Sequence, residues 1–143
     1  MTVRSILESK GRDVMVITPD DTLAHAVAVL AEHRIGALVV CDRDGRIKGI
    51  LSERDVVRAI AAQAVGAMDV PVSQVMTAKV QVCHEHHTIN QVMETMTRSR
   101  FRHMPVEEGG KLVGIISIGD VVKRRIEDVE REAEEIRTYI ATA

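Results

Sequence analysis

The apolar positions of the chain change their period several times, and each change predicts a strand or a helix. Residues 14–18 (VMVIT) form a short apolar run, and apolar residues then recur at helical spacing after an N-cap at Asp21 or Thr22. Two further apolar runs, 36–42 (GALVVCD) and 47–52 (IKGILS), flank a glycine-bearing turn, and a second helix follows them. This order predicts a β-α-β-β-α unit.

The same order returns about 66 residues later. Runs at 80–83 (VQVC), 103–108 (HMPVEE) and 112–117 (LVGIIS) take the places of the three strands, and Thr88 takes the place of the helix cap. With one residue dropped at the hairpin turn, ten positions are identical between the copies; they include Thr22 and Thr88, Arg34 and Arg100, Gly49 and Gly114, Ser52 and Ser117, and Asp55 and Asp120. Units repeated in tandem generally cannot bury their apolar faces alone.

The repeat predicts the fold class and the domain boundaries. We expect an α+β fold of two tandem βαββα units, the first in residues 1–66 and the second in residues 67–126, packed as one compact module. Short amphipathic segments at 3–7 (VRSIL) and 72–76 (VSQVM) precede the two copies. Residues 127–143 are predicted to be a helical extension of the second unit.

One long helix is predicted from about residue 120 to residue 140. Apolar residues follow one another at steps of three and four, with charged residues between them: Ile126, Val129, Ala133, Ile136 and Ile140. This apolar face could dock on the protein's own domain or form the seam of a dimer. We favour the dimer.

Composition and charge narrow the classes of function. Of 143 residues, 45% are apolar and 28% charged, which is typical of a globular protein. The net charge of −2 and the near absence of aromatic residues argue against nucleic acid as a partner. Cys41 and Cys83 are the only cysteines and are far apart in the sequence, which suits a reducing cytoplasm better than a disulfide framework. We expect no membrane span and no signal peptide, and therefore a cytoplasmic protein.

The repeated Ser-x-x-Asp segment has two interpretations. Ser52 with Asp55, and Ser117 with Asp120, have the form of a capping box, in which each side chain bonds the other residue's backbone N–H. A helix N-terminus also suits a phosphate, and an aspartate beside it can accept two hydrogen bonds from a ribose diol. Gly49 and Gly114 lie just upstream and would let a ligand or a neighbouring backbone come close.

These features together resemble a known family. The tandem βαββα unit, the apolar-Gly-apolar-apolar-Ser-x-x-Asp signature in both copies and RHMPV at 102–106 are similar to a pair of cystathionine-β-synthase (CBS) domains, of the stand-alone bacterial type. The resemblance implies a pseudo-two-fold arrangement of the units and dimerisation through helices. It also implies two clefts for adenosine-containing ligands: AMP, ADP, ATP, NAD(H) or S-adenosylmethionine.

The resemblance assigns residues to each cleft. The first cleft would be formed by Val14, Ile35, Gly36, Ala37, Ser52, Arg54 and Asp55. The second would be formed by Lys79, Val80, Arg102, His103, Met104, Pro105, Ser117 and Asp120. Arg100, like its equivalent Arg34, could contact a phosphate or could simply favour the negative end of its helix. Because Gly119 replaces Arg54 in the second copy, we expect the two clefts to differ in affinity or in preferred ligand.

Residues 83–88 (CHEHHT) contain one cysteine and three histidines, which are ligands that zinc prefers. No second group of ligands accompanies them, and their spacing fits neither a CxxC nor an HExxH pattern, so we expect no metal. Whether His84, His86 and His87 have a role is left open. No pair of nucleophile and base is evident, and we therefore expect no enzymatic activity.

The sequence thus predicts a regulatory module that binds AMP, ATP or NAD(H) between the two units and reports energy or redox state to a partner protein. The regulated partner is not predicted by the sequence. One alternative is a dimeric scaffold that acts without a ligand. Another, from a different class, is a metal-dependent enzyme built on residues 83–87.

Overall fold

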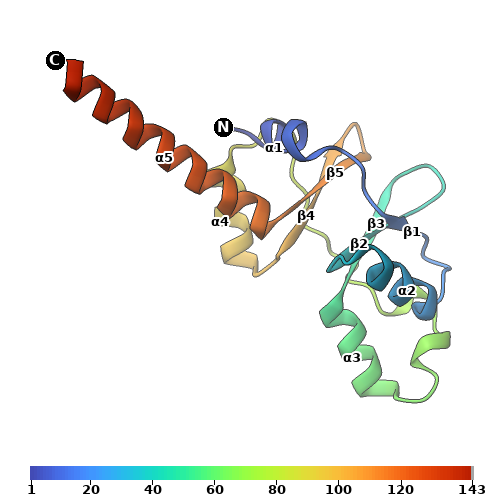
Figure 1. Ribbon diagram of the computed structural model, residues 1–143. Coiled ribbons are helices and arrows are strands. Elements are labelled where there is room, and N and C mark those ends of the chain that lie inside the picture. Colours follow the sequence, from blue (N-terminus) through green and yellow to red (C-terminus); the bar gives the residue numbers. More distant parts are fainter. Residues whose placement is uncertain (143) are drawn as a thin grey trace.

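The computed structural model describes residues 1–142 and divides them into two α+β units side by side (Figure 1). The first unit contains β1 (Val16–Ile17), α2 (Leu23–His33), β2 (Ala37–Cys41), β3 (Ile47–Ser52) and α3 (Glu53–Gln63). Its sheet has the order β1-β2-β3, with β1 parallel to β2 and β2 antiparallel to β3. Of the two candidate caps of α2, Thr22 is the N-cap, because its side chain accepts a hydrogen bond from the N–H of His25.

The second unit repeats this order with one strand fewer. It contains α4 (Ile89–Ser99), β4 (His103–Glu108), β5 (Lys111–Ser117) and α5 (Ile118–Thr142), and β4 pairs antiparallel with β5. The side chain of Thr88 caps α4 as predicted. The mixed α+β architecture with a long C-terminal helix is therefore confirmed.

The strand predicted at residues 80–83 is reduced to a single parallel bridge between Cys83 and Val106. Cys83 donates its N–H to the carbonyl of Pro105 and accepts from the N–H of Glu107. The next pair of bonds in a parallel ladder would require an N–H at position 105. Pro105 has none, so the pairing ends after one residue.

The segments that precede the two units are exchanged between them. Helix α1 (Val3–Lys10) packs into the core of the second unit, where Val3 and Leu7 are fully buried. The short 3₁₀ helix η2 (Val72–Gln74), which follows the 3₁₀ helix η1 (Ala67–Asp69), packs in turn into the core of the first unit. Thr2 accordingly bridges to Thr88, and Pro71 bridges to Thr22. This reciprocal exchange follows the predicted pseudo-two-fold relation. It also means that each unit is completed by a segment from the other side of the boundary expected at residue 66.

Gly49 and Gly114 admit the exchanged segments. A Cβ at Gly114 would lie 2.7 Å from Cδ2 of Leu7, and one at Gly49 would lie 2.6 Å from Sδ of Met76 and 2.8 Å from the carbonyl oxygen of Thr77. Both glycines were expected to allow the close approach of a ligand or of a neighbouring backbone. The neighbours are the protein's own exchanged segments.

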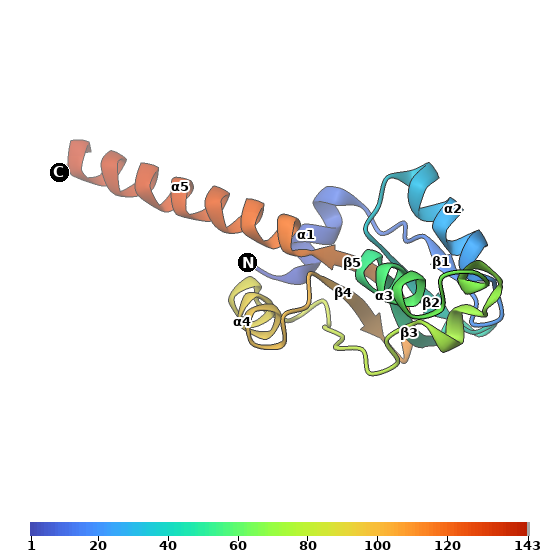
Figure 2. The ribbon, with the colours of Figure 1, turned by 90° about the horizontal axis from the view of Figure 1, so that it is seen from below.

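Helix α5 extends well beyond the two units, which lie at its N-terminal end (Figure 2). Its apolar stripe does not dock on the body of the same chain: the exposed fraction is 53% for Ile126, 46% for Val129, 59% for Ile136 and 68% for Ile140. The stripe of α5 therefore does not pack on the protein's own domain, which was one of the two alternatives for it.

Candidate functional site

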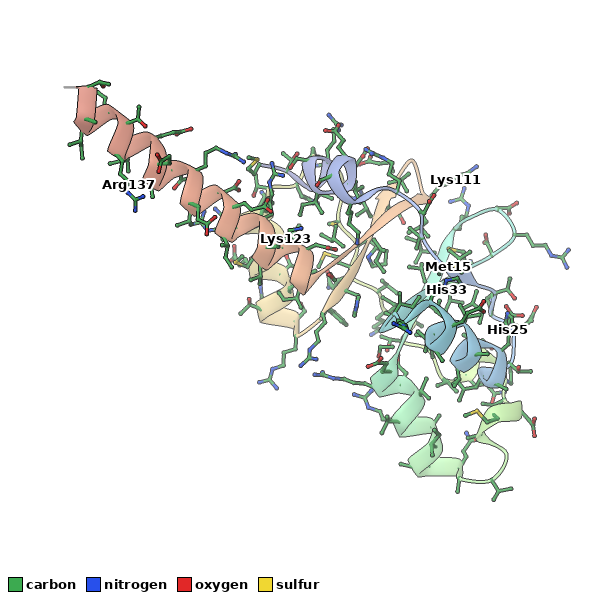
Figure 3. The ribbon with its side chains drawn as sticks, viewed as in Figure 1. Met15, His25, His33, Lys111, Lys123 and Arg137 are labelled. Atoms are coloured by element: carbon green, nitrogen blue, oxygen red, sulfur yellow. The ribbon has the colours of Figure 1, made fainter. Side chains whose placement is uncertain are left out.

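A cleft of about 310 Å³ lies where the two units meet, and we call it the inter-unit cleft. Five of its residues are apolar: Val14, Met15, Ile35, Ala37 and Ile115. The others are Lys10, Asp13, Gly36, His103 and Ser117. Figure 3 labels Met15, which lies on the segment between α1 and the first unit. The cleft thus combines an apolar wall with a few polar groups, which is the usual composition of a small-molecule site.

Strand pairing in both units brings the cleft residues together. His103 lies opposite Ser117 at the end of the β4–β5 hairpin, and Ala37 lies opposite Ser52 at the equivalent place in β2–β3. A Cβ at Gly36 would be 3.4 Å from Cε1 of His103, an ordinary van der Waals contact, so the two residues are direct neighbours. The two hairpin ends therefore face each other across the cleft.

Asp120 stands beside the cleft, at the first turn of α5. Its Oδ2 accepts the Ser117 N–H at 2.9 Å, and Ser117 Oγ accepts the Asp120 N–H at 3.2 Å, which completes a capping box. The same Oδ2 accepts from Nζ of Lys10 at 2.7 Å, and Lys10 Nζ also donates to the carbonyl of Ile115 at 3.0 Å. Within residues 1–142, Oδ1 of Asp120 has no protein partner at hydrogen-bond distance.

The charge state of these groups follows from their neighbours. Burial is the largest influence on Asp120 and raises its pKa, but the hydrogen bonds from Lys10 and Ser117 outweigh it, and the pKa is lowered overall. Burial lowers the pKa of His103, and the nearby Lys10 ammonium lowers it further. At neutral pH the imidazole of His103 in the cleft is therefore neutral, and Asp120 beside the cleft is ionised.

The equivalent aspartate of the first unit is enclosed. Asp55 Oδ2 accepts from Ser52 N at 2.9 Å and Ser52 Oγ at 3.1 Å, and Oδ1 accepts from Thr77 Oγ1 at 3.2 Å. The Asp55 side chain is 6% exposed, whereas that of Asp120 is 25% exposed. Both carboxylate oxygens of Asp55 are thus satisfied by the protein itself, and the two aspartates differ chemically.

The structure groups the predicted residues differently from the sequence-based assignment. The cleft takes Val14, Ile35, Gly36 and Ala37 from the predicted first site and His103 and Ser117 from the predicted second site, with Asp120 adjoining them. Its remaining residues, Lys10, Asp13, Met15 and Ile115, were not predicted. Only the exchange of α1 brings Lys10 to Asp120, and no local pattern in the sequence indicates that contact.

The other predicted residues do not line the inter-unit cleft. Ser52 and Asp55 bond each other in a capping box. Met104 and Pro105 are buried, and Met104 belongs to the core of the second unit. Val80 is half-buried, whereas Arg54, Lys79, Arg100 and Arg102 are exposed. Arg100 adopts a left-handed backbone conformation (φ 58°) as the C-cap of α4, and its equivalent Arg34 does the same for α2.

The histidine cluster organises a loop. His87 Nδ1 accepts the N–H of His84 at 2.9 Å, and Nδ1 of His84 contacts the carbonyl of Glu107. In the part of the chain that the structure describes, no group of three or more His, Cys, Asp or Glu residues is placed to hold a metal ion. Burial raises the pKa of the Cys83 thiol to about 12.

No helix among residues 1–142 is long and apolar enough to cross a membrane.

Comparison with known proteins places this arrangement in a family. The family model of the CBS domain matches twice, at residues 3–62 and 72–127, which begin at the two exchanged segments. The chain belongs to the CBS-domain family. A crystal structure of a CBS-domain containing protein from Agrobacterium tumefaciens is 50% identical, with a TM-score of 0.84 over 87% of this chain and 99% of that one.

Curated relatives agree with this assignment. An uncharacterised 17.7 kDa protein of Acidianus ambivalens is 37% identical over 111 residues, covering 77% of this chain and 66% of that one. A mitochondrial CBS domain-containing protein of Arabidopsis thaliana is 31% identical over 147 residues, covering 97% of this chain and 71% of that one. This chain therefore spans about two thirds of the length of these curated relatives.

Two more distant CBS structures contain ligands. CBSX2 was solved in complex with AMP and is 23% identical, with a TM-score of 0.71, over 80% of this chain and 89% of that one. A CBS domain pair solved with 5′-methylthioadenosine and S-adenosyl-L-methionine is 22% identical, with a TM-score of 0.78, over 90% of this chain and 98% of that one. At these identities the likeness establishes the common fold.

Proposed function

We propose that this CBS pair is a regulatory module that binds an adenine nucleotide in the inter-unit cleft. The observation that carries the proposal is the Asp120–Lys10 pair beside an apolar wall, because it offers an acceptor for a sugar next to a cation for a phosphate. The ligands of the two distant relatives, AMP in one and S-adenosyl-L-methionine with 5′-methylthioadenosine in the other, support an adenosine-containing ligand.

Each group has a defined task in this proposal. The apolar side chains of Val14, Ile35 and Ile115 cover the faces of the adenine. Oδ1 of Asp120, which has no partner among the described residues, accepts hydrogen bonds from the ribose hydroxyls. An ammonium has three N–H donors, and Lys10 uses two of them on Asp120 and Ile115, which leaves one for a phosphate oxygen.

The same charges suggest an order of preference among ligands. Lys10 favours an anionic phosphate over the cationic sulfonium of S-adenosylmethionine. We therefore propose AMP, ATP or NAD(H) as the ligand of this cleft, with S-adenosylmethionine weaker. Because both oxygens of Asp55 are already bonded, we expect the first-unit aspartate to contribute little to binding.

Regulation follows from the position of the cleft. Residues of both units line it, so a ligand that fits one relative orientation better would shift the protein toward that orientation. We propose that this shift reports energy or redox state to a partner protein in the cytoplasm, that the module has no catalytic activity of its own, and that it acts as a homodimer. The exposed apolar face of α5 supports the homodimer.

Isothermal titration with AMP, ATP, NADH and S-adenosylmethionine tests the proposal. We expect saturable binding of at least one of the three phosphate-bearing ligands, and loss of about 10-fold or more in affinity in Asp120→Asn, because each lost charge-assisted hydrogen bond is worth about 1.5–3 kcal/mol. The matched control is Asp21→Asn. Asp21 also accepts from a backbone N–H, that of Thr18 at 3.0 Å, but unlike Asp120 it bonds no residue that lines the cleft.

The competing function is a scaffold that works without a ligand. The observation that favours it is that both capping boxes are complete within the protein alone. Absence of binding by all four compounds would support the scaffold. An equal loss of affinity in Asp120→Asn and Asp21→Asn would show that the effect of Asp120 comes through stability alone, and the proposed sugar contact would then be wrong.

A further inference from the structure

We infer that the α5 helices of two copies pair as a parallel, in-register coiled coil. The inference rests on the proposed homodimer and specifies its geometry. The apolar residues Val122, Ile126, Val129, Ala133, Ile136 and Ile140 follow one another at alternating steps of four and three. This spacing is the a/d pattern of a heptad repeat, with Ile126, Ala133 and Ile140 at a and Val122, Val129 and Ile136 at d.

The stripe lies on a face of α5 that the protein's own body leaves free. Val121 and Asp128 are the buried residues of α5 and, with the half-buried Arg124, mark the face turned toward the body. At about 100° per residue, the centre of the apolar stripe lies roughly 130° around the helix from this inward face. A second helix can therefore approach the stripe without displacing any packed residue of α5.

The charges beside the stripe favour the parallel orientation. In a parallel dimer, a residue at g faces the residue five positions later, at e, on the other helix. Arg125 then faces the partner's Glu130, and Glu132 faces the partner's Arg137. By symmetry each contact occurs twice, so all four pairs are of opposite charge. Arg125, Glu130 and Glu132 have no ion pair within residues 1–142.

The antiparallel alternative places like charges together. If the two stripes overlap fully in that orientation, Ile126 faces the partner's Ile136, and the flanking positions meet e to e and g to g. Glu130 then lies against the partner's Glu130, and Glu132 against the partner's Glu132. Lys123 approaches the partner's Arg137, and Figure 3 labels this lysine and this arginine near the two ends of the projecting helix.

The parallel pairing has a structural consequence for the ligand site. Both bodies lie at the same end of the paired helices, because each body lies at the N-terminal end of α5 (Figure 1). Asp120 precedes Val122, the first residue of the stripe, by less than one helical turn. The proposed ligand contact and the seam between the two copies therefore lie at the same end of α5.

Disulfide trapping in the full chain distinguishes the two orientations. We propose oxidation of Ile136→Cys alone and of Ile136→Cys mixed with Ile126→Cys. In the parallel pair the two 136 positions are adjacent, and the covalent dimer of Ile136→Cys is the main product. In the antiparallel pair those positions are separated by ten residues, about 15 Å, and the mixed 126–136 dimer forms in its place. The native Cys41 and Cys83 are buried and do not compete.

Sedimentation equilibrium of charge variants provides a second readout. We expect Glu132→Arg to weaken self-association about 10-fold, because two attractive pairs become repulsive, and the added substitution Arg137→Glu to restore it. The matched control is Glu135→Arg, an equal charge change at an exposed position outside the seam. Formation of the mixed 126–136 dimer, or equal weakening by Glu132→Arg and Glu135→Arg, overturns the parallel geometry. A monomeric wild type at all concentrations overturns the homodimer as well, whatever the ligand titrations give.

Discussion

Leu7 and Gly114 make one of the contacts by which the exchanged helix α1 packs on the second unit, and a double-mutant cycle at this pair tests the exchange. Leu7 is fully buried in the core of the second unit. A Cβ at Gly114 would lie 2.7 Å and 2.9 Å from its two Cδ atoms. The perturbations are Gly114→Ala, Leu7→Ala and the two together.

The magnitudes follow from packing. Overpacking by one methyl group at Gly114 costs about 1–3 kcal/mol, offset by about 0.4–1 kcal/mol because alanine restricts the unfolded chain. Leu7→Ala alone costs about 2–5 kcal/mol through lost burial and the cavity that remains. In the double variant the new methyl group occupies space that Leu7 has vacated, so we expect the total to fall below the sum by about 1–3 kcal/mol.

Urea unfolding followed by far-UV circular dichroism measures these free energies, since the chain has no tryptophan. The first unit provides the internal control. Met76→Ala removes the sulfur that a Cβ at Gly49 would approach at 2.6 Å, but the backbone carbonyl of Thr77 stays at 2.8 Å. We therefore expect less rescue of Gly49→Ala. If the losses for Leu7 and Gly114 add to within about 0.5 kcal/mol, the inferred contact between α1 and β5 is wrong.

Two further predictions concern charge at the inter-unit cleft. Lys10→Met should cost about 0.2–1 kcal/mol at neutral pH, since the side chains of this pair are 35% and 25% exposed. The pKa of Asp120 is lowered in the folded protein, so the ion pair with Lys10 stabilises the fold above the ordinary aspartate pKa, and this stabilisation is lost as pH falls through the folded value. In urea unfolding, the stabilities of wild type and Lys10→Met should therefore converge in acid. A stability difference that stays constant with pH would contradict the ion pair. The pKa of His103 is lowered by burial, so the unfolded chain takes up the proton first and stability decreases as pH falls below the ordinary value of 6.5. NMR titration of the imidazole checks this, and a pKa at or above that value in the folded protein would refute it.

Local signals in the sequence were sufficient for the elements and their order. Thr22 and Thr88 cap the helices that they were expected to cap, because an N-cap depends only on residues within one turn. The βαββα order followed from apolar periodicity and the glycine turns. The strand expected at 80–83 was wrong because the run of apolar residues there satisfies the pattern, whereas the pairing depends on Pro105 in a strand more than twenty residues away.

The sequence alone therefore determined the repeat, the α+β class and the equivalent positions of the two Ser-x-x-Asp segments in the two units. Only the tertiary structure decided that α1 packs on the second unit, that Lys10 meets Asp120, and that Thr77 closes off Asp55. The physical reason is range. Caps, turns and periodicity are set by neighbours along the chain, whereas a cleft is set by which distant segments pack together, and in this protein the two leading segments pack on each other's unit.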